Sequence, residues 1–300
     1  MIYYSPLRYP GGKGKISPFF SELFIANNLV GGTYVEPYVG GGSIALYLLI
    51  NGIANRIIIN DRDRSIFAFW HSILNHTDEF CQLILNTPVT METWHEQKQI
   101  QRNKIDADLL QLGFSTFFLN RTNRSGIIKG GVIGGLQQTG NYLIDARYNC
   151  NKLKERIETI ARYSNQIELY NLDAVELVNN LRNDLPHNCL FYFDPPYYKK
   201  GKQLYMNYFS HEDHVRIESA IRQHINCDWI ITYDDVAQIE YQKWIVTYDK
   251  VDFIQELYKN FRMYEYSLNY SASTIGKGKE YMILSNNCTM PVCSPLELYP

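Results

Sequence analysis

The first part of the chain shows the hydrophobic pattern of a strand–helix–strand unit. Residues 33–39 (TYVEPYV) predict a strand, the glycines at 40–42 a turn, and residues 43–51 (SIALYLLIN) a helix. A second strand is predicted at 56–60 (RIIIN) and another helix from about Asp63.

The same alternation returns in the second half of the chain. Helices are predicted at 151–163, 174–182 and 211–224. Strands are predicted at 167–172, 189–193, 228–233 and 280–286. Strands that alternate with helices are typical of a mostly parallel sheet with helices on both faces, so we expect an α/β fold.

A different pattern separates these two halves. Helical periodicity runs through much of 63–119, and the following segment 120–141 (NRTNRSGIIKGGVIGGLQQTGN) holds six glycines with little periodicity. We interpret it as a loop or a glycine-rich hairpin. The sheet domain is therefore predicted at 1–72 and 150–300, with a mainly helical insert at 73–149.

Basic residues gather in and around this insert. The chain has a net charge of −2, yet residues 98–156 hold ten Lys and Arg against four Asp and Glu. An exposed, glycine-rich basic segment suits contact with a phosphate backbone or base edges. Its candidate DNA-binding residues are Arg121, Asn123, Arg124, Ser125 and Lys129. Solvated helix faces remain the alternative, above all for Lys152, Lys154 and Arg156.

Composition excludes several classes of protein. The longest apolar run, 44–50, is far shorter than the roughly 20 residues that cross a bilayer. The six cysteines are widely spaced without a C-x-x-C pair, which indicates reduced thiols and no metal site. The amino terminus lacks the pattern of a secretory signal, so we expect a cytoplasmic protein.

The glycine turn is a candidate cofactor site. Gly40, Gly42 and Ala45 satisfy G-x-G-x-x-A, and Asp61 follows about twenty residues later, at the end of the next predicted strand. This pattern fits an adenosine-containing cofactor whose ribose hydroxyls bind the acid. Alone it does not separate a nicotinamide dinucleotide from another adenosine cofactor, and a plain turn with a helix-capping Asp stays open.

The segment 190–201 (LFYFDPPYYKKG) carries the most specific chemistry. An apolar strand ends in Asp194, Pro195, Pro196 and Tyr197. Each proline removes an N–H, so the turn offers oxygen acceptors beside a carboxylate and an aromatic ring. This combination fits a planar heterocycle with an exocyclic amino group.

With these motifs the sequence resembles the Dam-like (D12) class of DNA adenine N6-methyltransferases, which use S-adenosylmethionine. The resemblance extends over most of the chain, with the motifs in the family's order. The similar segments are RYPGGK (8–13), VEPYVGGGS (35–43), INDRD (59–63), FFLNRTNRSGII (117–128) and FDPPYY (193–198). The resemblance implies a Rossmann-like methyltransferase sheet with an inserted target-recognition domain.

The resemblance also implies roles for individual residues. The catalytic motif is Asp194, Pro195, Pro196 and Tyr197, and Lys13 is expected to bind the methionine carboxylate of the cofactor. Asp173 resembles the family's acid for the cofactor adenine, although it can equally cap the helix at 174–182. The full set of implied cofactor-binding residues is Tyr9, Lys13, Glu36, Tyr38, Gly40, Gly42, Asp61, Asp173 and Asp194.

Two segments depart from the family pattern. The run 120–126 (NRTNRSG) stands where Dam-like enzymes commonly place an aromatic residue before Asn-Gly, so no GATC target is carried over. Tyr9-Pro10 replaces the tryptophan and small residue of many members.

The implied activity is methyl transfer from S-adenosylmethionine to the N6 amine of an adenine flipped out of duplex DNA. Duplex DNA is the expected partner, with a cognate restriction endonuclease as a further candidate. A cytosine N4-methyltransferase and a non-catalytic DNA-binding protein on the same fold are the alternatives. A dehydrogenase would leave the Asp-Pro-Pro-Tyr motif and the basic insert unexplained.

Overall fold

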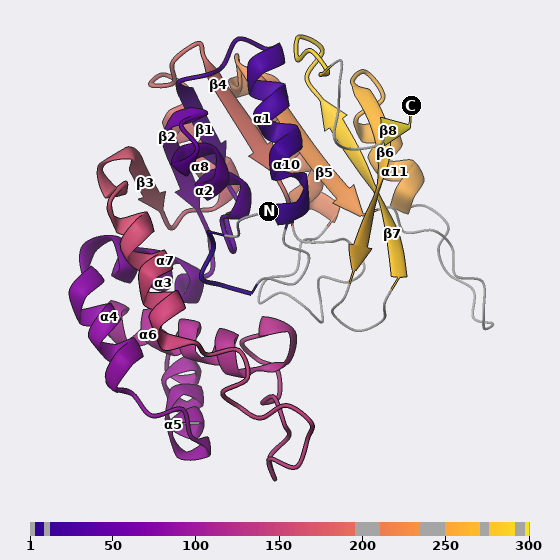
Figure 1. Ribbon diagram of the computed structural model, residues 1–300. Coiled ribbons are helices and arrows are strands. Elements are labelled where there is room, and N and C mark those ends of the chain that lie inside the picture. Colours follow the sequence, from indigo (N-terminus) through magenta and orange to yellow (C-terminus); the bar gives the residue numbers. More distant parts are fainter. Residues whose placement is uncertain are drawn as a thin grey trace, which may run out of the picture.

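The computed structural model describes residues 4–8, 13–195, 211–234, 250–270, 276–291 and 298–299. In these ranges the chain forms one eight-stranded sheet with helices on both faces. A mainly helical body lies beside one edge of the sheet, at the lower left of Figure 1. The expected α/β fold is confirmed.

The sheet has the order β3-β2-β1-β4-β5-β7-β6-β8. Its strands are β1 (Gly32–Glu36), β2 (Ala54–Asn60), β3 (Ile167–Tyr170), β4 (Cys189–Phe193), β5 (Asp228–Asp234), β6 (Arg262–Tyr270), β7 (Gly276–Leu284) and β8 (Leu298–Tyr299). The first five strands are parallel, whereas β7 pairs antiparallel with β5 and β6 pairs antiparallel with both β7 and β8. The strand order reverses at β1, which lies between β2 and β4.

Alternate residues of the central strands serve two separate cores. Tyr34 of β1 packs with α1 (Ser17–Ala26) and α2 (Ser43–Ile50) on one face. Val35, the next residue, packs on the other face. The helices of that second face are α8 (Ala174–Leu181), α10 (His211–His224) and α11 (Lys250–Leu257). Burial on both faces explains why these strands are continuously apolar.

The helical body connects β2 to β3. It consists of α3 (Arg64–Asn75), α4 (Thr77–Asn86), α5 (Met91–Arg102), α6 (Leu109–Thr122) and α7 (Cys150–Ala161). Helices α3 and α5 both pack on α6, and α7 packs on α3 and α4. This packing therefore extends on both sides of the expected 73–149 insert, whose domain boundaries stay a prediction.

The glycine-rich segment starts later than its sequence suggests. Helix α6 continues to Thr122, so Asn120 and Arg121 are helical, and a short 3-10 turn follows at Arg124–Gly126. One isolated bridge joins Asn123 to Val132. The remainder of the segment is a series of turns, which fits the loop interpretation better than a regular hairpin.

The described elements include some that hydrophobic patterning did not predict. These are α1, α11, β6, β8 and the short 3-10 helices Lys13–Ile16 and Ser164–Gln166. No helix among the described residues is long and apolar enough to cross a membrane. The five cysteines within the described ranges are free, and no metal-binding group of His, Cys, Asp and Glu is found there.

Candidate active site

The candidate site residues meet at the carboxyl ends of the parallel strands. The glycine turn follows β1, Asp61 follows β2, Asp173 lies just beyond β3, and Asp194 follows β4. Since these strands are parallel neighbours, their ends share one edge of the sheet. The strand order reverses at β1, and ligands of such folds usually bind at the carboxyl ends of the strands beside such a reversal.

The glycine turn and Asp61 form one hydrogen-bonded unit. Gly40 and Gly42 have φ angles of 45° and 60°, a left-handed conformation that favours glycine. The Gly40 N–H donates to Asp61 Oδ2 at 3.0 Å, and the Gly40 carbonyl accepts from Trp70 Nε1 at 3.0 Å. A Cβ on Gly42 would lie 2.7 Å from the Trp70 ring. Trp70 and Asp61 therefore hold the turn in place.

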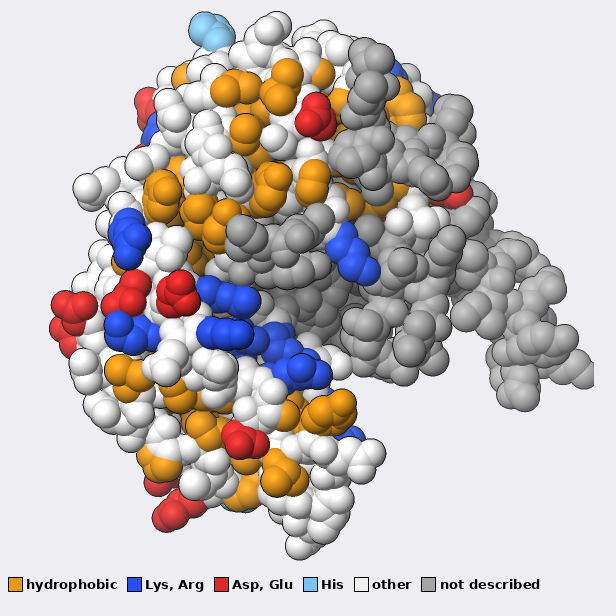
Figure 2. All heavy atoms as spheres, in the orientation of Figure 1, with side chains coloured by type: hydrophobic (Ala, Val, Ile, Leu, Met, Phe, Trp, Pro, Cys, Tyr) orange, Lys and Arg blue, Asp and Glu red, His pale blue; other side chains and the backbone are white. Residues whose placement is uncertain are grey.

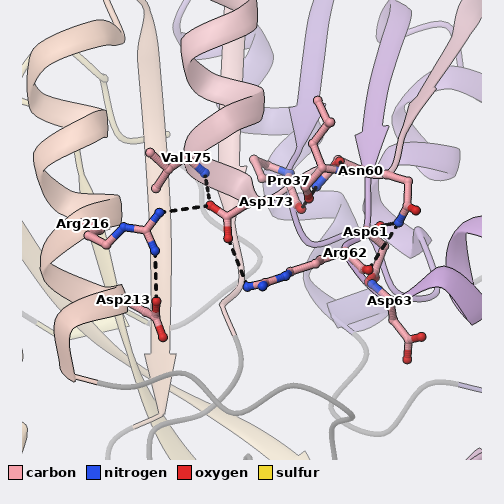
Figure 3. Close-up of polar contacts among 11 residues, drawn as sticks. Pro37, Asn60, Asp61, Arg62, Asp63, Asp173, Val175, Asp213 and Arg216 are labelled. Carbon is pink, nitrogen blue, oxygen red and sulfur yellow. Dashed lines mark hydrogen bonds and ion pairs between the residues drawn. The ribbon is translucent and has the colours of Figure 1, made fainter.

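Asn60 was not assigned a role from the sequence, yet it joins two loops of the site. Its Nδ2 donates to the carbonyls of Pro37 at 2.9 Å and Leu172 at 3.0 Å, and its Oδ1 accepts from Leu172 N at 2.8 Å (Figure 3). It thereby ties the segment after β1 to the segment after β3. The only sequence signal was a polar residue ending an apolar strand.

Asp173 caps α8, as the alternative interpretation of the sequence predicted. Its Oδ1 accepts from the Val175 N–H at 3.1 Å. Its Oδ2 accepts from Arg62 Nη1 at 3.2 Å (Figure 3). Arg216, which also pairs with Asp213, has its Nη2 3.9 Å from Asp173 Oδ1. The charged bridge from Arg62 joins the loop after β2 to the start of α8.

Glu36 and Tyr38 directly precede the glycine turn in the chain. Glu36 ends β1, is 5% exposed, and its Oε2 has no hydrogen-bond partner among the described residues. Burial raises the pKa of this carboxyl well above its ordinary value, and the charge of Asp194 adds to the shift. Burial also raises the pKa of Tyr38. A buried acceptor without a partner beside a glycine turn is suited to a polar ligand.

Within the described ranges, the hydrogen bonds of Asp194 are made by one oxygen. Its Oδ1 accepts from Lys13 Nζ at 3.0 Å and from Thr232 Oγ1 at 3.1 Å. Its Oδ2 has no hydrogen-bond partner within the described part of the chain. Lys13 also pairs with Glu280 at 3.2 Å. Thr232 and Glu280 were not recognised as site residues in the sequence, because no pattern around them indicates a specific role; the segment 277–286 that holds Glu280 is similar to the family but was assigned no function.

Three residues assigned from the sequence lie outside the described residues. These are Tyr9, Pro196 and Tyr197. Pro195 is described and buried.

Two asparagines stabilise the expected recognition segment. Asn120 exchanges hydrogen bonds with the Arg8 backbone, accepting at 2.7 Å and donating at 2.8 Å. Asn123 is fully buried: its Oδ1 accepts from Trp94 Nε1 at 2.7 Å and its Nδ2 donates to the Ile127 and Ile128 carbonyls. The side-chain amide of Asn123 is thus already used to hold the loop, and its expected contact with DNA stays a prediction.

The basic residues of this region differ strongly in exposure. Arg124 and Lys129 are exposed, and Ser125 is half-buried with φ at 55°. Arg121, by contrast, is 8% exposed, and its Nε has no hydrogen-bond partner among the described residues. The expected exposed position of Arg121 is therefore wrong, because helix α6 carries it into the interior.

Arg121 belongs to a cluster of like charges. Burial, with further contributions from Arg156, Arg8 and Arg147, lowers its pKa to about 9. We call Arg8, Arg121, Arg147 and Arg156 the arginine cluster. Arg8 Nη1 donates to the Asn123 carbonyl at 3.2 Å and Arg156 Nη1 to the Ser5 carbonyl at 3.1 Å. Figure 2 shows Lys and Arg side chains gathered in a band between the sheet above and the helical body below.

With this geometry described, comparison with known families decides the class of protein. The model of the D12 class N6 adenine-specific DNA methyltransferases matches residues 9–272. The chain belongs to this family. It is therefore an N6 adenine-specific DNA methyltransferase by family, and this family implies S-adenosylmethionine as methyl donor.

Individual relatives are distant. The type II methyltransferase M.MjaIII of Methanocaldococcus jannaschii is 22% identical over 237 residues, 72% of this chain and 78% of that protein. An rRNA methyltransferase from Streptomyces viridochromogenes is similar at 11% identity and a TM-score of 0.37, covering 95% of this chain and 90% of that one. An rRNA methylase from Streptococcus thermophilus gives 9% and 0.31, covering 88% and 93%. These two scores are too low to add to the assignment.

Proposed function

We propose that this D12 family member is a site-specific DNA-methyltransferase (adenine-specific) that methylates an adenine flipped out of duplex DNA. The observation that carries this proposal is Asp194, fixed through Oδ1 by Lys13 and Thr232 with Oδ2 left without a partner in the described structure. A carboxylate held in this way at a strand end can accept a hydrogen from a planar amine.

The residues around the glycine turn fit S-adenosylmethionine. Asp61 uses one lone pair on each oxygen for the Gly40 and Asp63 N–H groups, which leaves capacity for two ribose hydroxyls. Glu36 offers an acceptor without a partner, and the left-handed Gly40 and Gly42 keep the backbone open. Asp173 is the candidate for the adenine amino group. When bound, S-adenosylmethionine supplies the methyl group as an electrophile.

Lys13 is proposed to act at Asp194 in addition to its expected role at the methionine carboxylate. Its ammonium is 3.0 Å from Asp194 Oδ1, so it stabilises the carboxylate and fixes its orientation. Tyr9 and Tyr197 remain candidates for stacking on the cofactor and on the target base, and the Pro195 carbonyl for the second N6 hydrogen.

For the amine, the proposed chemistry is positioning and electrostatics. The N6 lone pair is delocalised into the adenine ring, and hydrogen bonds from N6 to Asp194 and to the Pro195 carbonyl favour tetrahedral character at nitrogen. A carboxylate is a poor base for a neutral aromatic amine, so the proton leaves during or after methyl transfer.

DNA binding is proposed to use two groups of basic residues. Arg124 and Lys129 are exposed on the glycine-rich segment, and Ser125 lies between them on the same segment. The arginine cluster is a concentration of positive charge at the base of that segment. Arginine is suited to bind phosphate because the N–H groups of its planar guanidinium can donate to two phosphate oxygens at once.

One assay tests the proposal. The protein is incubated with labelled S-adenosylmethionine and mixed-sequence duplex DNA, and the product is digested to nucleosides. We expect label in N6-methyladenine. Label in N4-methylcytosine, or no transfer to any base, would contradict the proposal. The similarity to a type II methyltransferase further suggests a cognate endonuclease blocked by this methylation, which a protection assay on methylated DNA would detect.

A further inference from the structure

A buried ion pair lies directly behind Asp194. Lys13 Nζ is 3.2 Å from Glu280 Oε2 and 3.0 Å from Asp194 Oδ1. The side chains of Lys13 and Glu280 are 3% and 0% exposed, whereas that of Asp194 is 22% exposed. Water therefore screens the two ion pairs of Lys13 little, and the position of its ammonium depends on both carboxylates.

Glu280 is itself fixed by its neighbours on the sheet. It lies on β7 opposite Tyr266 of β6, and the Tyr266 hydroxyl donates to Glu280 Oε2. On its other side β7 pairs with β5, the strand that supplies Thr232. The antiparallel end of the sheet thus brings a carboxylate beneath the parallel strand end that carries Asp194.

The charge balance around Lys13 indicates the effect of Glu280. Lys13 has one positive charge between two carboxylates, so neither acid holds the ammonium alone. Burial raises the pKa of Glu280, and the charge of Lys13 opposes that shift. Without Glu280, the ammonium loses one of its two buried ion-pair contacts with carboxylates, and Asp194, which must accept the N6 hydrogen, balances more of its charge.

We propose that Glu280 is a positioning residue for methyl transfer. It holds Lys13 at Asp194 Oδ1, so that Oδ2 remains available to the target amine, and Tyr266 holds Glu280 in turn. This inference rests on the proposed function, because it acts through the role assigned to Asp194. It adds a functional part for the antiparallel strands, which carry no catalytic motif.

The test is Glu280→Gln, which keeps the size of the side chain and removes its charge. In single-turnover assays with saturating substrates we expect methyl transfer to slow by at least about tenfold, as loss of a charge-assisted contact does. Saturating cofactor keeps any change of cofactor affinity that acts through Lys13 out of this rate, and the DNA dissociation constant should stay within about threefold. Glu218→Gln is the matched control: Glu218 is 8% exposed on α10 and pairs with Arg222, so its rate should equal that of the wild type.

A double mutant separates positioning from general structural damage. If Glu280 acts through Lys13, Glu280→Gln should slow a Lys13→Met enzyme much less than it slows the wild type. Equal slowing in both backgrounds, a rate above half of wild type, or a loss of cofactor affinity that accounts for the slower rate would overturn the inference. If Glu280→Gln does not fold, Tyr266→Phe replaces it, and an unchanged rate in that variant overturns the inference.

The wild-type reaction distinguishes a failure of the proposed function from a failure of the role assigned to Glu280. A wild type that transfers no methyl to adenine refutes the proposed function. A wild type that does so while Glu280→Gln remains fully active refutes only the role of Glu280.

Discussion

Among single residues, Asp194 is the one on which the proposed reaction depends most. We predict that Asp194→Ala lowers kcat to less than about a tenth of wild type, a loss of more than about 1.4 kcal/mol of transition-state stabilisation. Cofactor affinity should change by no more than a few-fold, because the carboxylate is assigned mainly to the target amine. Single-turnover kinetics and calorimetric titration measure the two effects.

Asp228→Ala is the matched control for this prediction. Asp228 is the first residue of β5, so it lies at the end of the strand away from the edge that carries Asp194. It accepts a hydrogen bond from the Ser285 hydroxyl at 3.3 Å. This substitution should leave the rate of methyl transfer intact. A rate for Asp194→Ala as high as that of Asp228→Ala would remove Asp194 from the mechanism.

Asp61 gives the site a dependence on pH. Burial, reinforced by the charge of Asp63, raises the pKa of Asp61 to about 7. Ribose hydroxyls donate to the ionised carboxylate, so cofactor binding favours the deprotonated form. We predict that the dissociation constant for S-adenosylmethionine falls as pH rises through about 7 and then levels off. Below that pH it should rise by up to about tenfold per unit.

Calorimetric titration across this range measures the dependence. Asp61→Asn removes the titrating group, so we expect weaker binding whose pH dependence is much reduced. If the wild type binds equally well on both sides of pH 7, the ribose does not contact Asp61. An unchanged affinity in Asp61→Asn would have the same meaning.

Two roles of Asp173 can be separated at the scale of elements. It caps α8 through the Val175 N–H and is also the candidate acceptor for the cofactor adenine. Asp173→Ala should reduce the free energy of unfolding by about 1 kcal/mol, whereas Asp173→Asn retains a capping side chain and should change it by a few tenths. Asp173→Ala should also weaken S-adenosylmethionine binding.

Asp108→Ala provides the control for the cap. Asp108 caps α6 by accepting from the Leu110 and Gln111 N–H groups. Its loss should cost similar stability, measured by urea unfolding, with cofactor affinity unchanged. If Asp173→Ala behaves in the same way as Asp108→Ala, Asp173 is a helix cap and has no part in cofactor binding.

Hydrophobic patterning predicted the βαβ unit and the later parallel strands because each has a simple local period. It placed the end of α6 too early, since residues 112–122 of that helix are buried on every side and show no amphipathic stripe. Polar Asn120 and Arg121 therefore suggested a loop. The antiparallel β6 lacked a motif, so its contribution to the site through Tyr266 required the sheet register to be known.

At the scale of the whole molecule, the functional site depends on contacts between distant segments. Asp61 and the glycine turn could be predicted together because their spacing is a known pattern. The link from Lys13 to Glu280 spans 267 positions in the chain and has no local signal. The arginine cluster likewise has no local signal, because Arg8 lies near the start of the chain and its partners lie more than about 100 positions later.

The arginine cluster leads to a prediction that couples stability to DNA binding. Burial and three neighbouring arginines lower the pKa of Arg121 to about 9, which means that its charged form is less favourable in the folded chain than in the unfolded one. The group is still charged at pH 7, so this charge destabilises the free protein. We expect Arg121→Met to raise the melting temperature and to weaken DNA binding, because a phosphate would otherwise neutralise the cluster.

Added salt should have the same two effects on the wild type, raising thermal stability while lowering DNA affinity. Arg121→Met should reduce the slope of log K against log salt concentration by about one, and S-adenosylmethionine affinity should stay unchanged. Arg124→Ala is the matched variant: its exposed side chain should affect DNA binding without raising the melting temperature. A lower melting temperature in Arg121→Met, together with wild-type DNA affinity and salt slope, would show that the buried arginine supports the fold and does not bind phosphate.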